Sequence, residues 1–131
     1  MGDVGLHFDR DEFRCKGEHC CGHAGPVSDR LVAALDELHI LLEEDQKSEA
    51  VYINVTSGFR CPVHNAEVKG DTQSYHMLGE AADIQVPGVS LLKVAALARK
   101  VRDFASGCVL VEPTWIHVDV RRRPPLPGKR R

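Results

Sequence analysis

Two short segments in which apolar and polar residues alternate constrain the fold of this chain more than any other sequence feature. Residues 115–120 alternate throughout, with Ile116, Val118 and Val120 on one side and Trp115, His117 and Asp119 on the other. Residues 81–86 repeat the pattern and set Asp83 opposite an apolar face. Successive side chains of a β-strand point to opposite faces, so each segment is expected to bury one face. If the two strands are neighbours, Asp83 and His117 lie about 5 Å apart on the same face of a sheet.

The remaining pattern predicts an α+β fold. Apolar residues recur at spacings of three and four between Ser28 and Gln46, which indicates an amphipathic helix with Ser28 as its N-cap. The other expected elements are a strand at 51–56, a loop-rich stretch at 57–80, a helix from Ser90 to about Phe104 and a strand at 108–111. We therefore expect a small single domain with a mainly antiparallel sheet flanked by helices.

Composition and charge narrow the class of protein. The 131 residues are 43% hydrophobic and 27% charged, as in an ordinary globular domain. No apolar run reaches the roughly 20 residues that cross a bilayer, so no membrane span is expected. Six of the 17 Lys and Arg residues fall in the last eleven positions, which divides the chain into a domain at 1–120 and a basic, proline-rich tail at 121–131. The tail is either a solvated extension or an electrostatic anchor to an anionic envelope polymer or a nucleic acid.

A third chemically active side chain lies just before the first alternating segment. His76 precedes the strand at 81–86, and Gly79 has the backbone freedom to fold the intervening loop back over the sheet. Together with Asp83 and His117, His76 would supply two imidazoles and one carboxylate to a metal ion. Three protein ligands leave a fourth position for water, which is the arrangement of a catalytic zinc ion rather than a structural one. Zinc lowers the pKa of such a water toward about 7 and makes it a nucleophile.

Three motifs in this region resemble the signatures of one enzyme family. Residues 74–83 fit the pattern S-x-H-x-x-G-x-A-x-D, residues 115–119 read W-I-H-V-D, and residues 57–60 read S-G-F-R. Their order resembles that of the M15 metallopeptidases, which include D-alanyl-D-alanine carboxypeptidases and phage endolysins. The resemblance implies a hedgehog/DD-peptidase-like fold and a zinc-dependent hydrolase. The implied substrate is a peptidoglycan stem peptide, cut at its D-Ala-D-Ala end or at an internal bond.

The resemblance also implies roles for single residues. The implied zinc ligands are His76, Asp83 and His117. Arg60 falls on the arginine that faces the substrate or its polarised carbonyl, a role that suits a guanidinium group. Ser74 and Gln73 are expected to support the site or to contact the substrate, although such side chains in loops often make local turns.

The identity of the general base stays open at this point. Many M15 peptidases carry Asp or Glu three residues before the last histidine ligand, and here Thr114 occupies that position. Glu112 is the nearest carboxylate on that side and is our first candidate. Asp119 is the second, although it can instead orient His117 from behind. Thr114 also keeps open an alternative function, a zinc-bearing binding module with weak or absent catalysis, as in the related hedgehog signalling domains.

The chain has five cysteines, and some of them could form a structural metal site or a disulfide. Cys15, Cys20, Cys21 and Cys61 can supply a structural zinc site, or Cys15 or Cys20 can form a disulfide with Cys61. The segment 1–27, which carries three of these residues, is expected to pack on the peptidase domain. Cys108 opens an apolar strand and is expected to be buried.

Partners and location follow from the same observations. The chain lacks a basic body and interleaved aromatic residues, so a zinc module that binds nucleic acid is the weakest reading and no specific nucleic acid is expected. The amino terminus lacks the basic stretch and apolar block of a secretory signal, which predicts cytoplasmic synthesis. The resemblance implies action on the cell wall, for example after phage-type release. We expect a monomer.

Overall fold

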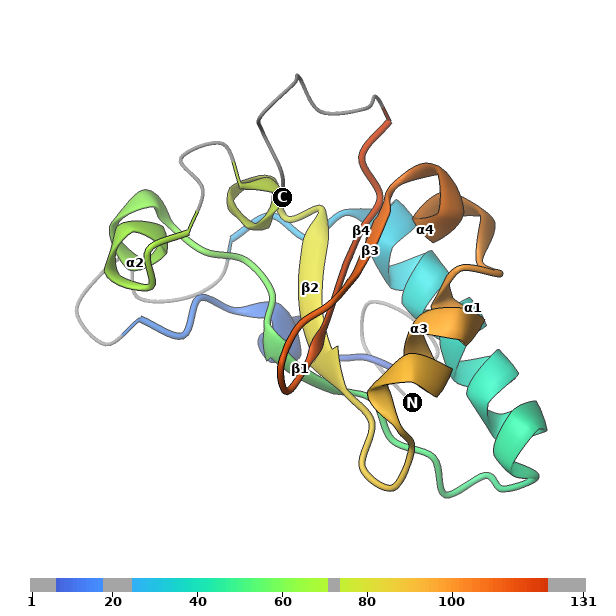
Figure 1. Cartoon of the computed structure of the whole chain (residues 1–131). Helices are drawn as coiled ribbons and strands as arrows, with labels where there is room; N and C mark the ends of the chain where they lie inside the picture. Colours follow the sequence, from blue (N-terminus) through green and yellow to red (C-terminus); the bar gives the residue numbers. More distant parts are fainter. Residues whose placement is uncertain (1–6, 18–24, 71–73, 123–131) are drawn as a thin grey trace.

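The computed structural model describes residues 7–17, 25–70 and 74–122, which form an α+β fold (Figure 1). This confirms the predicted fold class. The elements in chain order are η1 (Arg10–Phe13), α1 (Asp29–Gln46), β1 (Asn54–Ser57), α2 (Pro62–Glu67), η2 (Tyr75–Leu78), β2 (Ala81–Gln85), α3 (Leu91–Ala98), α4 (Arg102–Ser106), β3 (Cys108–Val111) and β4 (Ile116–Asp119). Here η denotes a 3-10 helix. No helix among the described residues combines the length and apolar character needed to cross a membrane.

The four strands form one antiparallel sheet in the order β1-β2-β4-β3. The two alternating segments are therefore neighbours, which the sequence had left as a condition, and Asp83 lies directly opposite His117 in the ladder between β2 and β4. The register between β1 and β2 shifts between Val55 and Ser57. Such a bulge bends the end of a strand, and here it lies where the chain leaves β1 toward the site.

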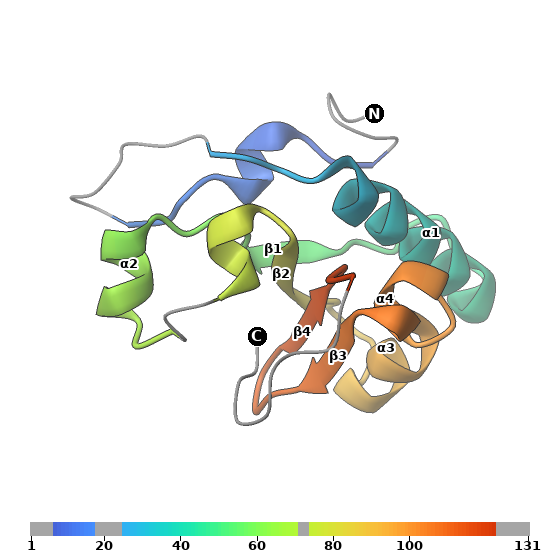
Figure 2. The same ribbon diagram turned by 90° about the horizontal axis from the view of Figure 1, so that it is seen from above.

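Helices α1, α3 and α4 gather on one side of the sheet, whereas α2 and η2 lie at its other end (Figures 1 and 2). The amphipathic pattern of α1 is confirmed, because its apolar stripe is buried and the Ser28 hydroxyl accepts a hydrogen bond from the backbone N–H of Leu31. The sheet packs its apolar residues into the same core, among them Ala82, Ile84, Ile116 and Val118. The opposite face is left to Asp83 and His117.

The helix predicted from Ser90 to about Phe104 is wrong in one respect, because it is two helices. Helix α3 ends at Ala98, and Val101 adopts an extended conformation with φ −79° and ψ 121° before α4 begins. Both Val101 and Phe104 are almost completely buried. Because Val101 and Phe104 are three positions apart, a continuous helix would also place them on one face, so the apolar spacing does not mark the interruption.

Three smaller differences concern the strands and the loop region. Strand β1 begins at Asn54 rather than Val51. The stretch read as loop contains α2, because Pro62 starts that helix, where its missing N–H costs nothing. Cys108 is partly exposed and not buried, since it lies at the start of the edge strand β3.

Candidate metal centre

Three elements bring the predicted ligands together. His76 lies in η2, Asp83 in β2 and His117 in β4, and one ligand atom from each lies within 4.8 Å of the other two. Asp83 Oδ1 is 3.3 Å from His76 Nε2 and 3.1 Å from His117 Nδ1. The two imidazole rings are tilted by 59° with centroids 5.2 Å apart, so they approach the carboxylate from different directions. All three residues are buried.

The outer nitrogen of each imidazole is held by an oxygen that can only accept a hydrogen bond. His76 Nδ1 lies 2.8 Å from the carbonyl oxygen of Gly58, and His117 Nε2 lies 2.9 Å from Asp119 Oδ2. We therefore place a proton on each of these nitrogens, which leaves lone pairs on His76 Nε2 and His117 Nδ1. His76 Nε2 is buried and lies 3.3 Å from Asp83 Oδ1 without a well-aligned hydrogen bond. A buried nitrogen lone pair beside a carboxylate fits a cation, so the residues present suit a divalent metal ion.

Local backbone geometry explains how the His76 loop reaches the sheet. Ser74 caps η2, because its hydroxyl accepts a hydrogen bond from the backbone N–H of His76 at 3.1 Å. Gly79 ends η2 in the left-handed region with φ +70°. A side chain at Gly79 would collide with the carbonyl oxygen of Pro26. The glycine is thus required both by its conformation and by the close approach of the segment before α1.

Arg60 holds the second oxygen of Asp83. Its guanidinium donates from Nη2 to Asp83 Oδ2 at 3.2 Å, from Nη1 to Asn65 Oδ1 at 3.0 Å and from Nε to Ser57 Oγ at 3.2 Å. Gly70 allows this arrangement, since a Cβ there would collide with Asn65 and Arg60. Asp83 is therefore oriented with Oδ1 toward the imidazoles and Oδ2 toward the arginine.

The surroundings shift the pKa values of these groups. Burial lowers the pKa of His76, which favours the neutral imidazole that a metal needs. Burial alone would raise the pKa of Asp83, but the adjacent imidazoles of His117 and His76 outweigh it and hold that pKa far below its usual range. Burial would lower the pKa of His117, but hydrogen bonds to Asp119 and Asp83 raise it instead. An ion that binds here therefore competes with a proton at His117.

Asp119 lies behind the centre and not in the pocket. Its carboxylate is fully buried, contacts His117 Nε2 and accepts bonds from Arg121 Nη2 at 2.6 Å and Nε at 2.8 Å. Burial alone would raise the pKa of Asp119, yet the hydrogen bonds to Arg121 and His117 lower it. Arg121, which the charge pattern groups with the basic tail, is itself buried and stacks on the ring of Tyr75. This geometry suits the orientation of His117.

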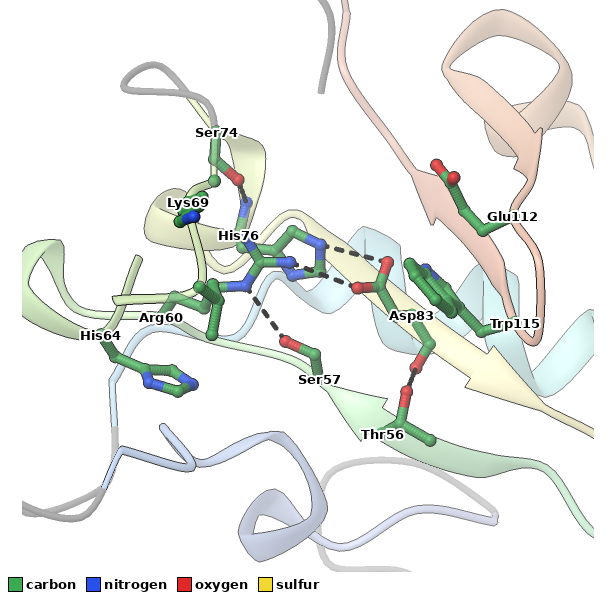
Figure 3. A pocket seen from close by; sticks show the side chains of 12 residues that line it. Thr56, Ser57, Arg60, His64, Lys69, Ser74, His76, Asp83, Glu112 and Trp115 are labelled. Carbon is green, nitrogen blue, oxygen red and sulfur yellow. Dashed lines mark hydrogen bonds and ion pairs between the residues drawn. The ribbon is translucent and has the colours of Figure 1, made fainter. Parts of the chain in front are cut away.

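A pocket of about 600 Å³ opens beside the three ligands. Its lining includes His76 and Asp83 together with Thr56, Ser57, Arg60, His64, Val68, Lys69, Gly70, Ser74, Glu112 and Trp115. Figure 3 shows Arg60 and His64 on one side of Asp83, and Glu112 and Trp115 on the other. Glu112 follows directly after β3, and its backbone N–H donates to the carbonyl oxygen of Trp115 at 2.9 Å. Of the two candidate bases, Glu112 is the one that faces the pocket.

Some expected or functional residues need separate comment. Gln73, Cys20 and Cys21 lie outside the described residues, as does the chain beyond Arg122. Sequence reasoning missed the pocket residues Thr56, His64, Lys69 and Trp115. The alternation in residues 115–120 already places Trp115 on the same side as His117 and could have found it. Thr56, His64 and Lys69 carry no comparable signal.

Two imidazoles and a carboxylate beside a pocket, with each imidazole held from behind by an oxygen, form a candidate mononuclear metal centre. The chain belongs to the Peptidase M15 family, whose model matches residues 6–119. It is therefore a peptidase of a family that is generally zinc-dependent. No curated protein matches the chain.

Proposed function

We propose that this protein is a zinc-dependent peptidase that hydrolyses peptidoglycan stem peptides, as a D-Ala-D-Ala carboxypeptidase or an endolysin-type endopeptidase, and so acts on the cell wall. One observation carries the proposal. The lone pairs of His76 and His117 and one oxygen of Asp83 converge beside a pocket, while the remaining polar atoms of all three side chains are held by other groups. The family membership supplies the reaction type.

Each residue has a distinct part in the proposed reaction. His76, Asp83 and His117 would hold the zinc ion, which when bound polarises the peptide carbonyl and acidifies water. Glu112 is proposed as the general base that takes a proton from the attacking water and returns it to the leaving amine. Arg60 keeps Asp83 in its ligating orientation.

Arg60 and Lys69 line one side of the pocket, which is here called the positive wall. This wall supports a substrate that carries a carboxylate. Lys69 lies on the same side as Arg60 (Figure 3), and a stem peptide presents carboxylates along its length and at its end. Lys69 also adopts φ +57°, a conformation that non-glycine residues rarely adopt and that sites of binding often retain. We propose that this wall orients the peptide across the centre.

The test uses purified protein with muropeptides, with and without a chelator, and identifies the products by mass. Release of D-alanine indicates a carboxypeptidase, and a shortened stem peptide indicates an endopeptidase. Glu112→Gln should lower turnover by about 10²–10⁴-fold while zinc stays bound, because the side chain then cannot accept a proton. Glu49→Gln, the same change at an exposed position, is the matched control. Full turnover by Glu112→Gln would show that the base is another group.

A binding module of the same fold is the second candidate, and Thr114 is the observation that favours it. Its backbone carbonyl oxygen accepts a hydrogen bond from Gln85 Nε2 at 2.9 Å, which links the connection between β3 and β4 to β2, and its side chain offers no carboxylate. Zinc bound by His76, Asp83 and His117 without turnover of any stem peptide would support this candidate and contradict the peptidase proposal.

A further inference from the structure

Two cysteines that are far apart in the sequence meet behind the metal centre. Cys15 follows η1 and Cys61 directly precedes α2, and their Sγ atoms lie 3.8 Å apart. Both side chains are buried, with 2% and 5% of their surface exposed. At that separation the two sulfur atoms are not joined to each other by a disulfide. This paired-thiol site shares no residue with the group formed by His76, Asp83 and His117.

The separation of the two sulfur atoms matches that of two ligands on one zinc ion. A Zn–S bond of about 2.3 Å and a tetrahedral angle place two thiolate sulfurs about 3.8 Å apart. A disulfide requires about 2.05 Å. The sulfur of Cys61 also accepts a hydrogen bond from the backbone N–H of His64 at 3.4 Å. A sulfur that accepts hydrogen bonds is stabilised as the thiolate, which is the form that ligates metals.

The paired-thiol site is connected to the metal centre by a short series of backbone contacts. The N–H of Phe59 donates to the carbonyl oxygen of Phe13 at 2.8 Å, and a Cβ at Gly58 would collide with the backbone of Phe13. The carbonyl oxygen of Gly58 in turn accepts from His76 Nδ1, as described above. A link between Cys15 and Cys61 therefore fixes the segment that sets the ring orientation of His76.

We propose that Cys15 and Cys61 are two ligands of a second, structural zinc site, separate from the catalytic centre. The sequence left zinc and a disulfide open, and the sulfur separation favours zinc. Cys20 and Cys21 lie outside the described residues, so the proposal is limited to the two described thiols. The proposal does not depend on the peptidase activity, because metal is counted separately from turnover.

Metal analysis of the full chain, purified under reducing conditions with zinc, tests the proposal. The wild type should hold two zinc ions per chain. The Cys15→Ser and Cys61→Ser variants should each hold one, and so should His76→Ala, which removes a ligand of the other centre. After replacement of zinc by Co²⁺, the thiolate-to-cobalt charge-transfer band should be present in the wild type and in His76→Ala. The band should disappear in the two serine variants. Cys108→Ser is the matched control, and its charge-transfer band should persist.

Labelling of the wild type keeps the test decisive if the serine variants do not fold. A thiol reagent should modify Cys15 and Cys61 in the native protein only after a chelator has been added. One zinc ion per chain together with chelator-independent labelling would overturn the proposal and leave a thiol–thiol hydrogen bond. Loss of two hydrogens in the mass of the unreduced protein, with both residues in one disulfide-linked fragment, would also overturn it. Failure of the peptidase proposal alone would leave the charge-transfer band intact.

Discussion

Replacing Asp119 with asparagine should weaken metal binding without moving any ligand out of position. The carboxylate of Asp119 contacts His117 Nε2 at 2.9 Å and so keeps the lone pair of Nδ1 directed at the ion. Loss of such a partner typically lowers metal affinity about 10- to 100-fold. This corresponds to about 1.4–2.8 kcal/mol of binding free energy.

The same substitution should also lower the free energy of unfolding. Asp119 is the buried partner of Arg121, which has 2% of its side chain exposed. Removing one member of a buried ion pair costs about 3–5 kcal/mol. Asparagine keeps one oxygen that can accept from the guanidinium, so the expected loss is smaller, about 1–3 kcal/mol.

Two measurements on one variant separate these effects. Competition with a chromophoric chelator gives the zinc affinity, and urea denaturation of the metal-free protein gives the free energy of unfolding. Asp103→Asn is the matched control, because Asp103 pairs with Arg30 at 3.5 Å at a partly exposed position. Such a pair contributes about 0–1 kcal/mol. Zinc affinity of Asp119→Asn within twofold of the wild type would refute the role assigned to Asp119.

Three further predictions concern the backbone, the core and the metal. Gly79→Ala should destabilise the protein by more than Gly88→Ala in denaturant titrations. Both glycines have positive φ, so each substitution carries a conformational cost of about 1–2 kcal/mol. Of the two, Gly79 alone faces a close carbonyl oxygen. Equal losses would contradict the proposed collision with Pro26. Leu35→Ala in the core should cost about 2–5 kcal/mol, whereas Leu92→Ala, at a side chain that is 74% exposed, should change stability little. Removing the metal with a chelator should abolish hydrolysis and lower the midpoint of thermal unfolding. Zinc at about 100 times its dissociation constant should raise the free energy of unfolding again by about 2.7 kcal/mol. A midpoint that does not change with zinc concentration would exclude binding to the folded state.

The sequence predicted the parts of the fold that repeat along the chain. Helix α1 was found because its apolar spacing and the Ser28 cap agree, and β2 and β4 were found because alternation marks strands with one buried face. The same alternation allowed Asp83 and His117 to share one face of the sheet, on the condition that β2 and β4 are neighbours. Periodic burial leaves a repeating pattern in the local sequence, so these elements can be predicted without information on the rest of the fold.

Features set by distant contacts were not predictable in this way. The interruption at Val101 is marked neither by a breaker residue nor by a change in the apolar spacing. The Arg60 contacts to Asp83 and Asn65 and the Gly58 contact to His76 join residues across loops, and no periodicity records them. Helix α2 was missed for a different reason, because Pro62 was read as a breaker although proline is favoured at the first position of a helix.

The pairing of Asp83 with His117 across the ladder has a practical consequence for anyone who studies the stability of this protein. These two residues are separated by 34 positions in the sequence, and only the assembled sheet brings them together. An unfolded chain would have to bring Asp83 and His117 together by closing the loop between them, which costs entropy, so the unfolded chain binds the ion weakly. Release of zinc to a fluorescent indicator can therefore report the opening of the sheet in real time, without any label on the protein.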